Sequence, residues 1–164
     1  MASNFLDVLN QLHDHHVEFV IVGGVAAALH GSSRVTFDLD VVTSLAPESW
    51  RAAVDLLWAL GARPRIPEPL DRIRDVEQVR QWRREKGMLA LTFRTPDGST
   101  EVDLLVGESD GFEGLRQRAV AVTLAERTFH VASIDDLIAM KQQAGRPQDL
   151  LDVAQLQDIR KRIE

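Results

Sequence analysis

The alternation of apolar and polar residues along the chain predicts a succession of strands and helices. Short apolar runs and period-2 alternation indicate strands, because successive side chains of a strand point to opposite faces of a sheet. Predicted strands cover residues 18–23, 37–43, 88–95, 100–106 and 128–131, and predicted helices cover residues 4–16, 24–30, 47–60, 134–144 and 148–162. This succession predicts an α+β fold in which helices flank a mixed β-sheet.

Connecting segments refine the prediction. The turn sequence Pro96-Asp97-Gly98-Ser99 lies between two predicted strands and predicts an antiparallel hairpin, which is why the sheet should be mixed. Three prolines within residues 63–69 predict a rigid connector. At 164 residues, with 45% hydrophobic and 27% charged residues, the chain is expected to form a single domain over residues 1–164.

The segment between Asp71 and Lys86 is locally basic. Its six basic residues outnumber four acids, and its apolar residues recur at every third position, which predicts an amphipathic helix with a positive outer face. One interpretation is a contact surface for RNA or another anionic acceptor. The other is a solvated arginine-rich helix that packs by its apolar stripe. The stripe consists of Leu70, Ile73, Val76, Val79 and Trp82.

Two carboxylates one residue apart lie on the predicted strand 37–43. Asp38 and Asp40 share one face of this strand and are about 6.6 Å apart, at about 3.3 Å per residue. Like charges at this spacing repel, and a divalent cation such as Mg²⁺ relieves the repulsion because it prefers carboxylate and phosphate oxygens. The residues expected on the opposite, core-facing side are Phe37, Leu39 and Val41.

A third carboxylate follows on the predicted strand 100–106. Asp103 shares a face of this strand with Glu101, which is a candidate for supporting contacts around a metal site. Three carboxylates on two adjacent strands can hold two metal ions about 3.5–4 Å apart, an arrangement that serves in-line phosphoryl displacement.

A glycine pair precedes the acids. Residues 19–22 form an apolar run that ends at Gly23-Gly24, and the residues that follow have a helix-forming composition. Glycines let a backbone approach phosphate oxygens closely, and free N–H groups at the start of a helix favour an anion. Because the pair precedes the acids by a short span, one nucleotide is expected to contact both.

The glycine pair and the acids belong to a longer series of motifs: Gly23-Gly24, Leu29-His30-Gly31, Arg34, Thr36, Asp38-Leu39-Asp40, Val102-Asp103-Leu104, Lys141, Arg146, Asp149 and Asp152. Over roughly residues 19 to 156, this series resembles the minimal nucleotidyltransferases of the DNA polymerase beta superfamily, and within it the bacterial abortive-infection and toxin–antitoxin (AbiEii-like) group. The resemblance implies a nucleotidyltransferase fold. It also implies Mg²⁺-dependent transfer of a nucleoside monophosphate from a nucleoside triphosphate (NTP) to an acceptor hydroxyl, with pyrophosphate leaving.

The resemblance also implies roles for individual residues. Asp38, Asp40 and Asp103 would bind two Mg²⁺ ions, Asp103 would also take the acceptor proton, and Lys141 would contact the triphosphate as a further catalytic residue. Many superfamily members have serine after the first glycine, where this chain has Gly24. A phosphate-binding hydroxyl must therefore come from elsewhere, with Ser32, Ser33 and Thr36 as candidates. The residues expected to contact the NTP are Gly23, Gly24, Ser33, Arg34, Thr36 and Lys141.

Four residues of these motifs and one histidine-rich cluster also have simpler, structural interpretations. Arg34 has two of them: a phosphate contact, or an anchor that ties its loop to a carboxylate. Arg146 and Asp149 are expected to pair across the turn between the last two helices, and His30 is expected to pack or cap beside the site. The cluster His13-Asp14-His15-His16 suits the end of a helix, where cations complement the helix dipole, better than it suits a zinc site.

The resemblance leaves the acceptor open. Toxin relatives suggest RNA such as tRNA, or a protein, and an accompanying antitoxin partner. The acidic net charge of −6 is mildly favourable for a small cationic acceptor such as an aminoglycoside. A non-catalytic, nucleotide-binding regulatory protein is a third alternative, against which the presence of all three acids speaks.

Composition excludes several other classes of protein. The absence of cysteine excludes disulfides, thiolate zinc sites and a cysteine nucleophile. The net charge of −6 argues against a generally nucleic-acid-binding surface. No apolar run approaches the roughly 20 residues that span a bilayer, and the first residues lack the basic and apolar regions of a signal peptide. A cytoplasmic location without a membrane partner is therefore expected.

Overall fold

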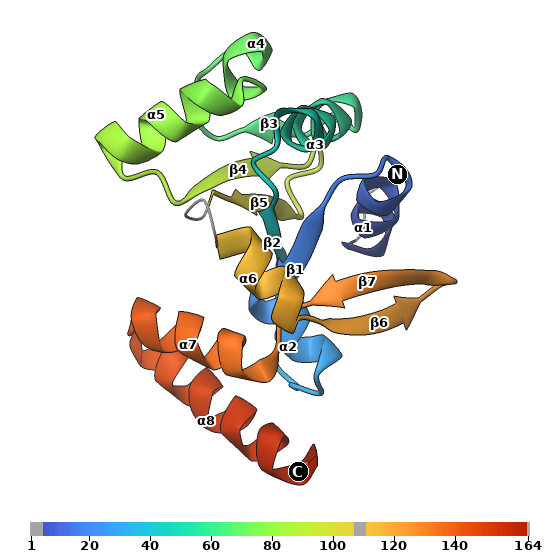
Figure 1. Cartoon of the computed structure of the whole chain (residues 1–164), viewed down its shortest axis with the longest axis vertical. Helices are drawn as coiled ribbons and strands as arrows, with labels where there is room; N and C mark the ends of the chain where they lie inside the picture. The colour runs from blue at the N-terminus through green and yellow to red at the C-terminus, as the bar shows by residue number, and fades with distance from the viewer. Residues whose placement is uncertain (1–4, 107–110, 164) are drawn as a thin grey trace.

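A single mixed sheet organises the computed structural model, which describes residues 5–106 and 111–163. The strand order across the sheet is β3-β4-β5-β2-β1-β7-β6 (Figure 1). The pairs β2–β5 and β1–β7 are parallel and the other pairs are antiparallel, so the predicted mixed sheet is confirmed. The strands are β1 (Phe19–Val22), β2 (Asp38–Thr43), β3 (Arg63–Pro64), β4 (Ala90–Arg94), β5 (Glu101–Leu105), β6 (Val120–Leu124) and β7 (Arg127–Val131).

Helices surround this sheet, with α7 and α8 packed against each other (Figure 1). Helix α7 begins where Ser133 Oγ accepts a hydrogen bond of 3.1 Å from the backbone N–H of Asp136, and it ends at Gly145. The helices are α1 (Phe5–Asp14), α2 (Gly23–Leu29), α3 (Pro47–Ala59), α4 (Leu70–Ile73), α5 (Val76–Lys86), α6 (Gly111–Arg118), α7 (Ile134–Ala144) and α8 (Pro147–Ile163). None of these helices is long and apolar enough to cross a membrane.

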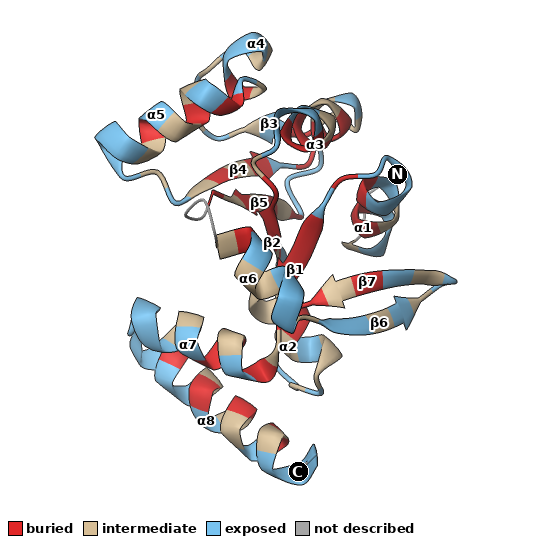
Figure 2. Cartoon of the chain, in the orientation of Figure 1, coloured by how far each residue is buried: buried red, intermediate tan, exposed pale blue. Residues whose placement is uncertain are grey.

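The core lies along the central strands and beneath the helices that cover them (Figure 2). Strand β1 is buried along its whole length, whereas β5 alternates between buried and half-buried residues. On β2, Leu39 and Val41 are fully buried, as predicted. The prediction that Phe37 faces the core is wrong, because its side chain is 72% exposed. Phe37 precedes the first residue of β2, so the alternation of the strand does not yet apply to it.

The predicted basic helix and the proline connector both differ from expectation. Residues 63–64 form the short strand β3 on β4, within the segment predicted as a connector. The helix expected between Asp71 and Lys86 is divided into α4 and α5. Asp75 causes the division, because its side chain accepts a hydrogen bond of 3.0 Å from the backbone N–H of Glu77 and caps α5.

Candidate active site

Two of the predicted acids lie side by side on the central strands. Strands β2 and β5 are parallel neighbours whose register pairs Asp40 with Asp103 and Asp38 with Glu101. Residues paired in this way point to the same face of a sheet, so these four carboxylates share one face. Asp103 Oδ1 is buried and has no hydrogen-bond partner among the described residues.

This crowding changes how readily the carboxyl groups lose their protons. Burial, together with a hydrogen bond to Asp103 and the charges of Asp103 and Asp38, raises the pKa of Asp40 to about 7, against the opposing effect of Lys141. Burial also raises the pKa of Asp38, as do Glu101 and Asp103, while Arg65 lowers it. The site therefore holds more negative charge than its own cations neutralise.

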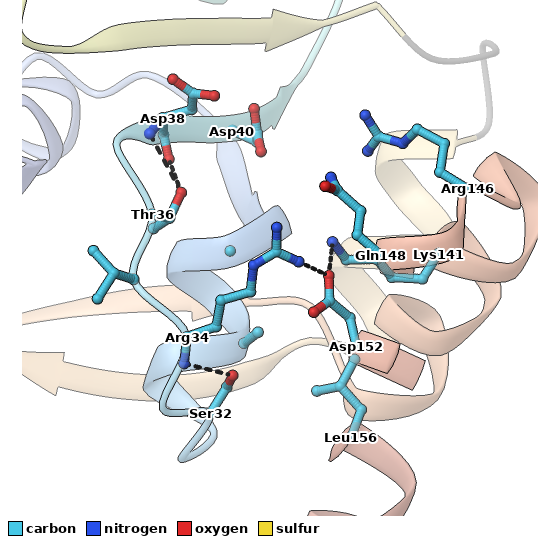
Figure 3. A pocket seen from close by; sticks show the side chains of 13 residues that line it. Ser32, Arg34, Thr36, Asp38, Asp40, Lys141, Arg146, Gln148, Asp152 and Leu156 are labelled. Carbon is cyan, nitrogen blue, oxygen red and sulfur yellow. Dashed lines mark hydrogen bonds and ion pairs between the residues drawn. The ribbon is translucent and has the colours of Figure 1, made fainter. Parts of the chain in front are cut away.

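The donor set suits a hard divalent cation. Carboxylate oxygens are the ligands that Mg²⁺ prefers, and the unpartnered, buried Oδ1 of Asp103 is the kind of acceptor that a cation satisfies. Within residues 5–106 and 111–163, however, no three His, Asp or Glu side chains stand together as a ready-made metal cluster. The carboxylates of Asp38 and Asp40 point in different directions (Figure 3). Metal binding would need these side chains to turn toward a common point.

Each residue of the glycine pair makes room for one side chain of the β2 region. Gly23 has a φ of +67°, and a Cβ atom there would lie 2.1 Å from Asp40 Oδ2. A Cβ atom on Gly24 would lie 2.8 Å from Thr36 Cβ and 2.9 Å from Thr36 Oγ1. The Thr36 hydroxyl is in turn within 3.3 Å of the backbone N–H and 3.2 Å of the backbone carbonyl of Asp38. The missing side chains of the glycines therefore leave the space that Asp40 and Thr36 occupy, an effect that the sequence did not indicate.

A polar hollow lies beside the acids, between the loop before β2 and the last two helices (Figure 3). Three cations from distant parts of the chain line it, namely Arg34, Lys141 and Arg146. The other lining residues are Gly24, Ala27, Ser32, Val35, Thr36, Asp38, Asp40, Gln148, Asp152 and Leu156. Most of the residues predicted to contact an NTP thus meet here; Ser33 and Gly23 are not in the lining.

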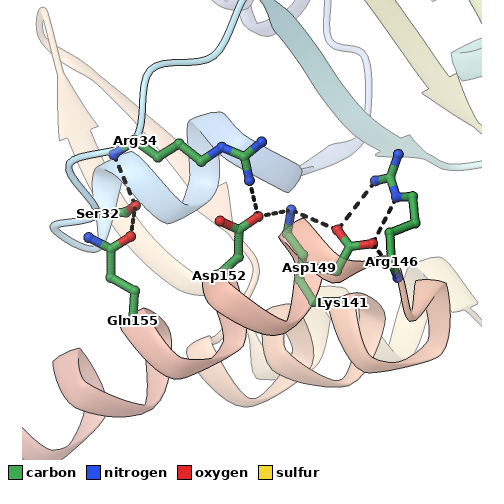
Figure 4. A network of polar contacts seen from close by, with 7 residues as sticks. All are labelled: Ser32, Arg34, Lys141, Arg146, Asp149, Asp152 and Gln155. Carbon is green, nitrogen blue, oxygen red and sulfur yellow. Dashed lines mark hydrogen bonds and ion pairs between the residues drawn. The ribbon is translucent and has the colours of Figure 1, made fainter.

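Asp152 on α8 joins two of these cations. Its carboxylate pairs with Arg34, and its Oδ2 atom accepts a hydrogen bond of 3.0 Å from Lys141 Nζ (Figure 4). Burial would raise the pKa of Asp152, but the hydrogen bonds from Arg34 and Lys141 hold it below its ordinary value. Arg34 therefore makes the loop-anchoring contact that the sequence left as one of two interpretations.

Asp149, one turn earlier on α8, is fully buried and holds the third cation. It accepts 2.8 Å and 3.1 Å hydrogen bonds from Arg146 Nε and the Arg146 backbone N–H, and Lys141 Nζ lies 3.6 Å from its Oδ1 (Figure 4). The hydrogen bond from the Arg146 side chain lowers the pKa of Asp149. The pairing of Arg146 and Asp149 across the turn is as the sequence predicted.

A residue that sequence reasoning missed completes the contacts of α8 with the loop before β2. Gln155 Oε1 accepts a hydrogen bond of 3.0 Å from Ser32 Oγ, and Gln155 Nε2 donates one of 3.1 Å to Ser33 Oγ. Asp149, Asp152 and Gln155 recur at three-residue intervals, which places them on one face of α8. This three-residue spacing was the sequence signal that could have identified Gln155. The hydroxyls of Ser32 and Ser33 are thus engaged by α8.

Comparison with known proteins identifies the family. The model of the family described as nucleotidyl transferase AbiEii toxin, type IV toxin–antitoxin (TA) system, matches residues 5–163. No curated protein sequence matches the chain. Among solved structures, the chain is similar to an antigenic nucleotidyltransferase-like protein from Paracoccidioides brasiliensis, with 18% identity, coverage of 90% of this chain and 70% of that chain, and a TM-score of 0.49. Because the family match extends over almost all of the sequence, the chain belongs to the AbiEii family of nucleotidyltransferase toxins.

Proposed function

We propose that this nucleotidyltransferase uses Mg²⁺ to move a nucleoside monophosphate from an NTP to an acceptor hydroxyl, as the toxin of a toxin–antitoxin pair. The observation that supports this most directly is the register of β2 and β5. It sets Asp40 beside Asp103, next to a hollow that Arg34, Lys141 and Arg146 line. Negative and positive groups are thus separated in the way that a metal-bound triphosphate requires.

The hollow is where the triphosphate would bind. Guanidinium and ammonium groups carry five and three N–H donors, so Arg34 and Lys141 keep donors for phosphate oxygens while paired with Asp152. Thr36 adds a hydroxyl at the same wall. Asp152 would keep both cations aimed at the phosphates, which makes it a positioning residue.

The chemical step is an in-line displacement at the α-phosphorus. The acceptor oxygen forms a bond to this phosphorus, the bond to the bridging oxygen of the β-phosphate breaks, and pyrophosphate leaves. Asp103 takes the acceptor proton and later releases it to water, and Lys141 balances the charge that develops on pyrophosphate. Two Mg²⁺ ions, held by Asp38, Asp40 and Asp103, would supply charge stabilisation and lower the pKa of the acceptor hydroxyl.

The proposed acceptor and the proposed partner protein are inferred from the family and not from the residues that line the hollow. A toxin of this class would act on an RNA such as a tRNA, or on a protein, and an antitoxin would restrain the consequences. No described contact selects the base of the NTP, so each of the four NTPs is a candidate donor.

Incubation with Mg²⁺ and each α-labelled NTP tests the proposal, using total RNA, protein extract and an aminoglycoside mixture as acceptors. Label should enter the RNA or the protein fraction. Asp103→Asn should abolish the transfer without unfolding the protein, whereas Asp71→Asn, at an exposed position on α4, should not change it. Label in the aminoglycosides would reject the toxin role, and the absence of both label and NTP binding would reject the proposed reaction.

A further inference from the structure

A row of paired residues crosses the sheet from its β3 edge to the acids. The register pairs Arg63 with Arg94, Arg94 with Glu101, and Glu101 with Asp38. Neighbouring strands are about 4.8 Å apart, so Arg94 lies two strands, or about 10 Å, from Asp38. The face that carries the acids therefore becomes basic toward β3 and β4.

Two arginines converge on one carboxylate in this row. Arg65 Nη1 lies 3.3 Å from Glu101 Oε1, and Arg94 Nη2 lies 3.2 Å from the same oxygen. The side chains of Arg65 and Arg94 are 58% and 55% exposed, against 21% for Glu101. Each guanidinium has five N–H donors, and the described contacts of these two side chains use one each. Both side chains therefore keep donors for a ligand.

The same arginines line a surface hollow at this edge. Arg63, Arg65 and Arg94 contribute to it together with Gly61, Pro64, Thr95 and Pro96. Arg63 is held in place, because its guanidinium lies 3.9 Å from the centre of the Trp58 ring and donates hydrogen bonds of 2.9 Å to the Trp58 and Ala62 carbonyls. The hollow thus carries three arginines, of which Arg65 and Arg94 share the single carboxylate of Glu101, and it has an excess of positive charge.

Stability does not account for this arrangement. Exposed ion pairs contribute only about 0–1 kcal/mol each, and a second arginine on the same oxygen adds little. The acids are flanked by two groups of cations: Arg34, Lys141 and Arg146 on one side, and the arginines of β3 and β4 on the other. The triphosphate of the proposed reaction accounts for the first group only.

We propose that the hollow at the β3–β4 edge is a second phosphate-binding site, in which Arg65 and Arg94 bind a backbone phosphate of an RNA acceptor. This inference rests on the proposed function, because it assigns the nucleotide to the other group of cations. Stacked nucleotides repeat about every 3.4 Å, so about 10 Å corresponds to roughly three nucleotides between the bound phosphate and the acceptor hydroxyl at the acids. Glu101 occupies part of the anion position while the site is empty.

The basic segment of α4 and α5 is the competing surface, and three of its arginines are each paired with one carboxylate. Arg72 pairs with Glu68 at 3.1 Å, Arg74 with Asp55 at 2.7 Å and Arg80 with Glu77 at 3.8 Å. Arg84 and Lys86 are exposed at the end of α5. Removing these two charges therefore gives a control that matches the removal of Arg65 and Arg94.

The test measures binding of a short, fluorescently labelled single-stranded RNA by anisotropy, without Mg²⁺ or NTP. Transfer rate is avoided as the readout because Arg65 also lowers the pKa of Asp38. The double variant R65Q/R94Q should weaken RNA binding at least tenfold and flatten its salt dependence. ATP binding should change less than twofold. R65K/R94K should restore part of the affinity, and R84Q/K86Q should have a much smaller effect. Thermal unfolding confirms that each variant is folded.

Replacement of Glu101 should change RNA affinity in the opposite direction. E101Q removes the competing carboxylate while preserving shape, so it should tighten RNA binding several-fold. Inorganic phosphate serves as the second probe. If phosphate binds the wild type but not R65Q/R94Q, and RNA binds neither protein, the hollow is a site for free phosphate and the assignment to the RNA acceptor is overturned. Equal RNA binding by wild type and R65Q/R94Q, or weaker binding by E101Q, would overturn the inference. Failure of the wild type to bind ATP would instead count against the proposed function.

Discussion

Replacing Asp40 with asparagine should stabilise the metal-free protein at neutral and alkaline pH. The folded chain raises the pKa of this carboxyl from 3.8 to about 7, because burial, Asp103 and Asp38 all disfavour its charged form. At 1.36 kcal/mol for each tenfold change in proton affinity, the rise corresponds to at most about 4 kcal/mol. Asp40 keeps some contact with solvent, so we expect asparagine to recover about 2 kcal/mol.

The direction of the pH dependence follows from proton linkage. Below pH 3.8 the carboxyl is protonated in both the folded and the unfolded chain, and folding carries no penalty. As the pH rises toward about 7, the unfolded chain releases the proton while the folded chain retains it, so the wild type progressively loses stability. The difference between D40N and wild type should therefore be small near pH 4 and largest near pH 8.

Urea unfolding followed by tryptophan fluorescence, in the presence of EDTA and across this pH range, measures the effect. Mg²⁺ should raise the unfolding midpoint of the wild type and leave that of D40N almost unchanged, because only the wild type keeps the full set of carboxylates. D71N should follow the wild type throughout. The reasoning is refuted if D40N is no more stable than wild type at pH 8, or if its advantage does not depend on pH.

Three further substitutions test local features of the site. Gly23→Ala should lower the free energy of unfolding by about 1–3 kcal/mol in urea titrations and abolish transfer, because the added Cβ would lie 2.1 Å from the carboxylate of Asp40 at a φ of +67°. Gly24→Ser should destabilise by a similar amount because the added Cβ would lie 2.8 Å from Thr36 Cβ, and the double variant G24S/T36G, which removes that atom, should recover part of that loss. Asp149→Asn should remove part of the acid sensitivity of the fold. Because Arg146 lowers the pKa of this carboxyl, its stabilising effect is present above the ordinary Asp value and disappears as the pH falls, which acid-unfolding midpoints would measure.

Gly98→Ala supplies the control for the first of these substitutions. Gly98 has a φ of +72° but nothing within 4 Å of an added Cβ, so it isolates backbone strain from collision. If G23A and G98A lose equal stability, the contact with Asp40 is irrelevant. Additive losses in G24S and T36G would show that Gly24 and Thr36 are not coupled. An Asp149→Asn variant that follows the wild type at every pH would contradict the third prediction.

The placement of the acids could be read from sequence because strand periodicity assigns side chains to faces directly. Alternation around Asp38 and around Asp103 fixed which face each carboxylate occupies, and two short strands with similar patterns were good candidates for neighbours. Periodicity does not show where pairing starts, which is why Phe37 was placed in the core although it precedes β2.

Elements without a buried face could not be predicted in this way. Strand β6 forms one edge of the sheet and its residues are exposed or half-buried, so its apolar residues Val120, Val122 and Leu124 do not mark a buried face. Its turn to β7 uses Ala125 and Glu126 with φ values of 48° and 67°, and neither is the Asn or Gly that usually signals such a turn. Helix α6 was not predicted either; it buries only Phe112.

Contacts between distant segments were also beyond the reach of local patterns. The hydrogen bonds of Gln155 with Ser32 and Ser33 join residues more than 120 positions apart. The closeness of Gly24 to Thr36 depends on how the chain returns to the sheet after α2. Such contacts become visible only when the fold brings the segments together.

The dependence of the loop before β2 on α8 sets an order of events during protein synthesis. A ribosome completes the acids and the glycine pair long before residues 147–163 emerge, and until then Arg34 and Lys141 lack the carboxylate that orients them. A nascent chain would therefore carry the carboxylates of β2 and β5 before the proposed triphosphate pocket is assembled. The proposed activity would therefore arise only after α8 has packed against the rest of the protein. Fragments that end before residue 147 should be harmless to the cell.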